Sequence, residues 1–188
     1  MLTHLLHRSS LLALVTLFSG CATPTTDLVV PINRVQAVPR TMETPRRVQV
    51  RVTDIRKEAQ LERTTIGAIS MGRVTLKPPA TELVQAIVEA KADEVLARGG
   101  LTQPQTVLCG IRVFEITTPA TLAYWDINTK IELVLRVRGQ DRTVSGMATE
   151  RTFIWPTQEI IGRVTNEALR QLGAETERAL AELFASSR

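Results

Sequence analysis

Histidine is almost missing from this chain. Its only histidines, His4 and His7, lie in an N-terminal segment that we expect to be removed. A mature chain without histidine has no Ser–His or Cys–His nucleophile pair, no imidazole base and no imidazole metal ligand. The sequence also has no zinc-ligand spacing and no glycine-rich phosphate loop, so we predict no metal and no cofactor.

Aromatic residues and cysteines are also scarce. Phe, Trp and Tyr make up 4% of the chain, which argues against a broad aromatic platform for sugars or single-stranded nucleic acid. The cysteines are Cys21 and Cys109. Cys109 lies in the apolar run "TVLCGIRVF" and is predicted to be a small buried hydrophobe; a reactive thiol or an intermolecular disulfide is the alternative.

The longest apolar run lies at the N-terminus. Residues 11–20 would form a helix of roughly 15 Å, about half the thickness of a bilayer core, and Arg8 precedes them. A charged start, a short apolar middle and a small-residue end are typical of a secretory signal peptide. We therefore predict that residues 1–20 are a signal peptide.

The end of this segment has the features of a lipid attachment site. The small residues Ser19 and Gly20 precede Cys21, whose thiolate can accept a lipid, and residues 18–21 ("FSGC") resemble a bacterial lipobox. An ordinary signal peptide cut near Ala22 is the alternative. The resemblance implies a mature chain that begins at lipidated Cys21. Because residue 22 is not Asp, it also implies the periplasmic face of the outer membrane of a Gram-negative bacterium.

Proline and threonine dominate the next stretch. Residues 21–46 are predicted to be the lipidated cysteine and a Pro/Thr-rich tether, with "DLVVPI" at 27–32 as a short edge strand within it. Residues 47–188 are long enough for one domain with its own core. We predict a single α+β periplasmic domain there.

Hydrophobic periodicity predicts the elements of this domain. Amphipathic helical spacing indicates helices over 82–98 and from 157 to about 184. Residues 57–65 are expected to be a loop, with a hairpin turn around Gly139 and a bulge at Gly146. Apolar residues alternate with polar ones at 46–56 and 127–139, which predicts strands there. Further strands are predicted at 73–77, in the apolar run 105–117 and at 143–154, which returns after the hairpin turn.

The order of these elements is strand, strand, helix, three strands, helix. One-sided strands and helices predict a two-layer α+β sandwich with a mixed, mostly antiparallel sheet of about four to five strands and both long helices on one face. The strand–helix–strand step around 82–98 is expected to be a right-handed crossover, and the last three strands an antiparallel meander.

Candidate chemistry is sparse. Asp54 and Asp126 are predicted near strand ends, and two carboxylates can hydrolyse glycosides when they are held close together. Their more ordinary interpretation is as turn residues. Ser145 lacks the flanking glycine of a nucleophile elbow and is interpreted as a strand residue.

Three aromatic residues form a candidate contact site. If the last two strands pair about Gly139, then Tyr124 and Trp125 lie close to Trp155. This cluster either closes one end of the core or forms an exposed contact for a partner.

Several segments together resemble the YajG-type lipoproteins of Gram-negative bacteria. They are the lipobox, "DLVVP", "VRVTDIR", a helix ending in "ARGG", "YWDINTKIELVLRV" and the long closing helix. The resemblance implies lipid attachment at Cys21, and this family has no established enzymatic activity to carry over to the chain. The element order also resembles small periplasmic domains of secretion-channel and exopolysaccharide lipoproteins.

These observations lead to two functional expectations. The first is a non-catalytic, lipid-anchored periplasmic protein of the outer membrane that acts as a binding or assembly accessory of the cell envelope. It would touch the membrane through its lipid, and bind a protein partner or a second copy of itself, but no nucleic acid. The alternative is a ring-forming or scaffold subunit of an envelope export or secretion complex.

Overall fold

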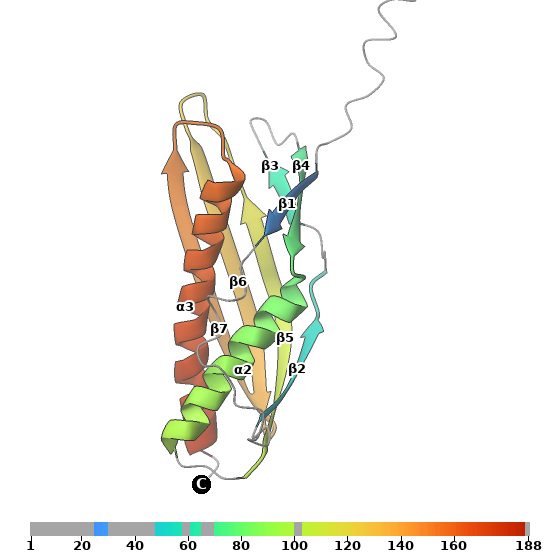
Figure 1. Cartoon of the computed structure of the whole chain (residues 1–188), viewed down its shortest axis with the longest axis vertical. Coiled ribbons are helices and arrows are strands. Elements are labelled where there is room, and N and C mark those ends of the chain that lie inside the picture. Colours follow the sequence, from blue (N-terminus) through green and yellow to red (C-terminus); the bar gives the residue numbers. More distant parts are fainter. Residues whose placement is uncertain (1–24, 30–47, 58–60, 65–69, 100–102, 187–188) are drawn as a thin grey trace, which may run out of the picture.

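The fold is an α+β sandwich, as predicted. The computed structural model describes residues 25–29, 48–57, 61–64, 70–99 and 103–186 (Figure 1). A four-stranded sheet has the order β2-β5-β6-β7, and a smaller sheet has the order β1-β4-β3. The elements, in chain order, are β1 (Thr25–Val29), β2 (Val48–Asp54), β3 (Leu61–Thr64), β4 (Ser70–Lys77), α2 (Ala80–Gly99), β5 (Gln105–Thr117), β6 (Trp125–Val137), β7 (Gln140–Thr152) and α3 (Gln158–Ala185).

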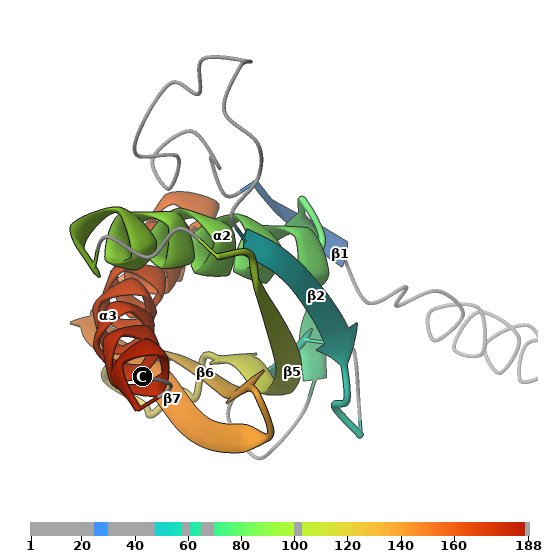
Figure 2. The same ribbon diagram turned by 90° about the horizontal axis from the view of Figure 1, so that it is seen from below.

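The four-stranded sheet is mixed and mostly antiparallel. β2 and β5 run parallel, whereas β5, β6 and β7 form the predicted antiparallel meander. α3 packs on β6 and β7, α2 packs on β2, and the two helices contact each other. Seen from below, the sheet curves around the core and the helices close the open side (Figure 2).

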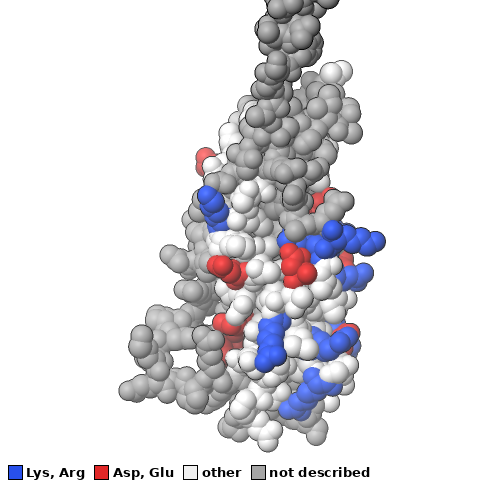
Figure 3. Space-filling view, turned by 90° about the vertical axis from the view of Figure 1, so that its right-hand side faces the viewer, with Lys and Arg blue, Asp and Glu red and all other residues white. Residues whose placement is uncertain are grey.

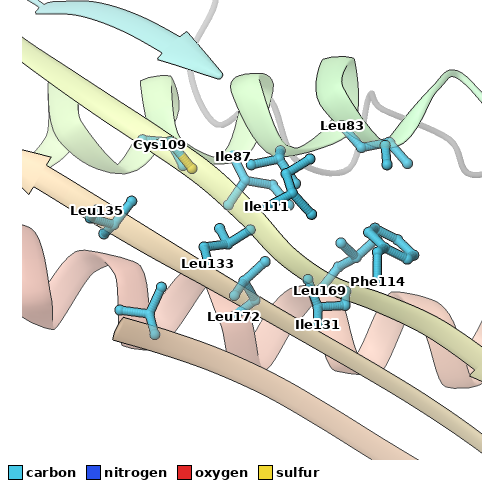
Figure 4. Close-up of a cluster of buried hydrophobic side chains, with 14 of the residues drawn as sticks. Leu83, Ile87, Cys109, Ile111, Phe114, Ile131, Leu133, Leu135, Leu169 and Leu172 are labelled. Carbon is cyan, nitrogen blue, oxygen red and sulfur yellow. The ribbon is translucent and has the colours of Figure 1, made fainter. Parts of the chain in front are cut away.

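The core follows from the alternating sequence. Alternate residues of β6 from Ile127 to Val137 are buried, as are the predicted apolar positions of α2. Side chains of both helices meet those of β5 and β6 in one cluster (Figure 4). Fully burying a side chain such as Leu133 or Leu172 stabilises the fold by about 1.5–3 kcal/mol.

The β6–β7 hairpin has a two-residue turn, as the sequence predicts around Gly139. Arg138 and Gly139 have φ values of 51° and 83°, as a type I′ turn requires. The pairing then continues without a break from Val137–Gln140 to Trp125–Thr152, so the predicted bulge at Gly146 is wrong. The irregularity lies instead in β5, between Ile111 and Val113.

A close approach of α3 explains Gly146. A Cβ atom added at Gly146 would overlap the carbonyl oxygen of Ala168 and lie 2.7 Å from the backbone nitrogen of Leu172. The glycine therefore lets the helix backbone rest directly on β7. The signal that suggested a bulge in the sequence reflects helix packing.

Two expectations about the chain from β3 to β5 are wrong. Residues 57–65, predicted to be a loop, contain β3, which pairs antiparallel with β4. The predicted crossover around 82–98 does not join neighbouring strands, because β4 and β5 belong to different sheets. The parallel neighbours in the larger sheet are β2 and β5, and the chain between them includes β3, β4 and α2.

β1 lies inside the segment 21–46 that the sequence presents as a tether. It pairs in parallel with β4, from Thr25 opposite Arg73 to Val29 opposite Lys77. The predicted signal peptide, Cys21 and the rest of this segment lie outside the described residues. Neither α2 nor α3, the helices of the described part, has the length and apolar character needed to span a bilayer.

Candidate functional site

The predicted aromatic residues meet at one end of the larger sheet. They come from the loop before β6, the first residue of β6 and the loop between β7 and α3. Together with their apolar neighbours they form a surface that we call the aromatic end. Its residues are Leu122, Tyr124, Trp125, Phe153, Ile154 and Trp155.

Strand register brings these residues together. Trp125 opposes Thr152 in the β6–β7 ladder, so the residues beyond each strand end are neighbours. The rings of Trp125 and Trp155 lie 4.9 Å apart at 68°, and those of Tyr124 and Phe153 lie 6.4 Å apart at 75°. Both are edge-to-face contacts, which aromatic rings favour. The predicted proximity of Tyr124, Trp125 and Trp155 is confirmed.

The aromatic end is only partly buried. Tyr124 and Trp125 are half-buried, whereas Phe153 is 76%, Ile154 63% and Trp155 48% exposed. Leu122, at the preceding loop, is 99% exposed. The inner rings therefore close the end of the sheet, and the outer side chains present an apolar surface to solvent.

Hydrogen bonds hold both loops of the aromatic end. The hydroxyl of Thr121 accepts from the backbone nitrogens of Ala123 and Tyr124, at 3.2 and 3.0 Å. The hydroxyl of Thr152 accepts from Ile154 N at 3.3 Å. Thr157 caps α3 by accepting from the backbone nitrogen of Ile160 at 3.4 Å. The exposed side chains thus stand on ordered backbone.

Arg151 borders the aromatic end. Its guanidinium lies 3.8 Å from the centre of the Tyr124 ring, a cation–π contact, and its Nε donates to Oδ1 of Asp126 at 2.8 Å. The hydrogen bond to Asp126 raises the pKa of Arg151, which keeps its positive charge. Sequence reasoning missed Arg151; its position opposite Asp126 in the β6–β7 register is the signal that could have found it.

Asp54 and Asp126 are not brought together. Asp54 pairs in register with Ile111, and Ile111 with Leu133. The stretch of β6 from Leu133 back to Asp126 spans roughly 23 Å, at about 3.3 Å per residue. Each carboxylate also has its own arginine: Arg56 for Asp54 and Arg151 for Asp126. The pair therefore cannot act jointly on one glycosidic bond.

The remaining candidates are structural. Ser145 is an exposed residue of β7, as predicted. Cys109 is 2% exposed, and burial raises the pKa of its thiol to about 12, so the prediction of a buried hydrophobe is confirmed. Within the described ranges, no group of three or more His, Cys, Asp or Glu side chains could hold a metal ion.

A groove lies at the opposite end, between α2 and α3. It has a volume of about 600 Å³ and is lined mainly by small and apolar side chains, among them Val95, Ala181 and Phe184. Arg98 and Glu177 also line the groove and form an ion pair that links the helices. Arg178, the third charged residue of the lining, pairs with Glu175 at 3.0 Å, so the charged side chains named here already have partners within the protein.

Charges of both signs share the surface. On the side drawn in Figure 3, Lys and Arg side chains lie among Asp and Glu side chains. Basic side chains of the described residues are also paired with acidic ones, for example Arg112 with Glu132 at 3.1 Å and Arg56 with Asp54. This side is therefore not a uniformly basic surface of the kind that binds polyanions by charge alone.

Comparisons with known proteins give distant structural similarities. No protein-family profile matches the chain, and no curated protein matches it in sequence. A solved uncharacterised protein is 13% identical, with a TM-score of 0.40 over 84% of this chain and 95% of that one. A DUF330 protein from Xanthomonas campestris is 9% identical, with a TM-score of 0.41 over 87% and 97%. A candidate lipoprotein from Caulobacter crescentus is 8% identical, with a TM-score of 0.30 over 53% and 80%.

Proposed function

We propose that this chain is a lipoprotein of the periplasmic face of the outer membrane, anchored through Cys21. One observation carries the proposal. Cys21 follows two small residues at the end of a short apolar segment, whereas the other cysteine, Cys109, is a buried core residue. The resemblance of residues 18–21 to a lipobox supports the same assignment.

The anchored domain acts by contact and not by catalysis. The aromatic end supports this part of the proposal, because it offers exposed apolar side chains on ordered loops. Such preorganised aromatic surfaces lose little conformational entropy on binding. The carboxylates considered for catalysis, Asp54 and Asp126, are each engaged by an arginine. The chain is thus a binding or assembly accessory of the cell envelope.

Labelling with radioactive palmitate in Gram-negative cells tests the anchor. We expect label in the wild type and in Cys109→Ala, which serves as the matched control, and none in Cys21→Ser. Cys21→Ser should also keep its N-terminal segment and run as a larger precursor on a gel, because removal of a lipoprotein signal peptide follows lipidation of the cysteine. Equal labelling of Cys21→Ser and the wild type would contradict the proposal.

A scaffold subunit is the second candidate function, and the outer face of the larger sheet favours it. On strands β5 and β7, this face exposes Leu108 (44%) and Met147 (62%). The register places Met147 six residues, or roughly 20 Å along β7, from the position level with Leu108, so each would be a separate contact if this face packed against a second copy. Sedimentation of the unlipidated chain at high micromolar concentration tests this candidate. A defined oligomer that Leu108→Asp dissociates would support it, and a monomer would refute it.

A further inference from the structure

β1 determines where the N-terminal chain enters the domain. All five of its residues pair with β4, and β1 also contacts α3. Thr25, its first residue, is the fourth residue after Cys21. The backbone between them therefore reaches at most about 14 Å. A lipid on Cys21 would hold the start of β1 within that distance of the bilayer surface.

β1 and the aromatic end lie in the same half of the molecule. In Figure 1, β1 is in the upper half, where β7 ends and α3 begins. The loops that carry Leu122 and residues 153–155 lie at this upper end of the larger sheet. A short connection keeps this half of the domain close to its anchor, so these loops would lie within reach of the membrane.

The chemistry of the aromatic end suits a bilayer interface. Trp and Tyr combine an apolar ring with a polar N–H or O–H group, and both are enriched where hydrocarbon meets headgroups. Leu122, Phe153 and Ile154 are the most exposed side chains of this surface. Side chains of this kind enter the boundary between headgroups and acyl chains to a depth of about 5–10 Å.

We propose that the aromatic end inserts into the lipid interface of the membrane that carries the Cys21 anchor, and thereby fixes the orientation of the domain. This inference rests on the proposed lipid anchor and names lipid as the partner of the candidate site. A protein partner is the other class of occupant. The bilayer is favoured because the short connection from Cys21 to β1 brings it within reach of this end.

Tryptophan fluorescence gives a direct test. The chain has two tryptophans, Trp125 and Trp155, and both belong to the aromatic end. The chain from Cys21 onward is coupled through the Cys21 thiol to a maleimide lipid in vesicles of phosphatidylethanolamine and phosphatidylglycerol. Cys109 is buried and does not compete. Brominated acyl chains, compared with unbrominated ones, should lower the tryptophan emission, because a bromine atom quenches an indole ring only when the two are close together.

Two variants locate the contact. The double variant Phe153→Ser, Ile154→Ser should lose most of the quenching, while Met147→Ser, which removes an exposed apolar side chain from the sheet face, should keep it. Circular dichroism before coupling confirms that both variants fold. Equal emission in brominated and unbrominated vesicles, with the chain attached, would overturn the proposal.

The remaining outcomes separate this inference from the anchor itself. The chemical coupling does not depend on lipidation in cells, so a failure of palmitate labelling refutes the anchor alone. Absent quenching with normal palmitate labelling refutes the interfacial contact alone. If quenching is absent and a photo-crosslinking side chain at position 154 joins an envelope protein in cells, the surface binds protein and the bilayer proposal is wrong.

Discussion

Gly146→Ala should destabilise the domain, although alanine is normally more stabilising than glycine within a strand. Replacing glycine by alanine within a strand normally stabilises by about 0.5–1 kcal/mol, because the unfolded chain has less freedom. In this protein the new Cβ would overlap Ala168 O and lie 2.7 Å from Leu172 N and 2.9 Å from Leu172 Cβ. Two of these are backbone atoms of α3, which cannot rotate away.

The size of the effect follows from the required movement. Restoring ordinary contacts of about 3.3 Å needs a shift of α3 on the order of 1 Å from β7. Overpacking of this kind costs about 1–3 kcal/mol, and the backbone position favours the upper end. A loss of about 3 kcal/mol corresponds to a decrease in Tm of roughly 10 °C for a domain of this size.

A second glycine provides the matched control. Gly173 also lies on a packed face of α3, but an added Cβ would be 3.6 Å from Lys91 Cε and 3.9 Å from Ile87 Cγ2. These are ordinary van der Waals contacts, so Gly173→Ala should stabilise α3 by about 0.5–1 kcal/mol. Thermal and urea unfolding followed by circular dichroism measure both variants. An unchanged or raised Tm for Gly146→Ala would refute the account of helix packing.

Two further predictions concern Cys109 and Asp54. Cys109 should resist maleimide in the folded protein at pH 8 and react in urea, because the thiol is buried and burial raises its pKa to about 12. Mass spectrometry measures the modification. Rapid labelling of the folded protein would contradict the burial of this thiol. The hydrogen bond from Arg56 lowers the pKa of Asp54 below its ordinary value of 3.8, so the pair stabilises the fold above that pH and loses this contribution as the pH falls through the folded pKa. Asp54→Asn should lower the free energy of unfolding by about 1–3 kcal/mol at pH 7, because the Arg56 side chain is only 8% exposed and would lose its charged partner. Urea titrations should show that this difference from the wild type becomes smaller towards pH 3. A difference that is constant from pH 7 to pH 3 would contradict the role of this ion pair.

The sequence predicts those elements whose signals are local. β5 has the predicted bounds because β-branched and other apolar residues dominate from Gln105 to Thr117, although the buried positions shift by one residue after Ile111, where its pairing with β6 is irregular. α3 begins beside Thr157 as expected, since its cap and apolar stripe lie in one continuous segment. The β6–β7 turn is set by Gly139 and its neighbours.

Features that the local hydrophobic pattern does not encode could not be predicted in the same way. β3 has the sequence "LERT", without periodicity, and becomes a strand because β4 supplies hydrogen-bonding partners. Gly146 looks like a bulge in sequence, since nothing local indicates that α3 will rest on it. The division of β4 and β5 between two sheets likewise depends on pairing over long separations.

The same distinction applies to the candidate site, of which only one part has a local signal in the sequence. Proximity of Trp125 and Trp155 follows from a hairpin register that the turn fixes, so it was predictable. The exposure of Phe153 and Ile154 could not be predicted. An apolar run has the same sequence pattern whether it fills a core or faces solvent. What decides exposure is whether another element covers that end of the sheet.

The packing of α3 on β7 also determines how the aromatic end is presented. The loop with Phe153 and Ile154 joins β7 to α3, so its shape depends on the relative position of these two elements. Contact at Gly146 and the cap at Thr157 fix that position from either side of the loop. Because β1 contacts α3 as well, the point where the N-terminal chain enters and the aromatic end are linked through a single helix. A lipid on Cys21 and an apolar surface on the loops beside the start of α3 would hold the domain at two places. Two attachments restrict its orientation, whereas a lipid on a long flexible tether would not.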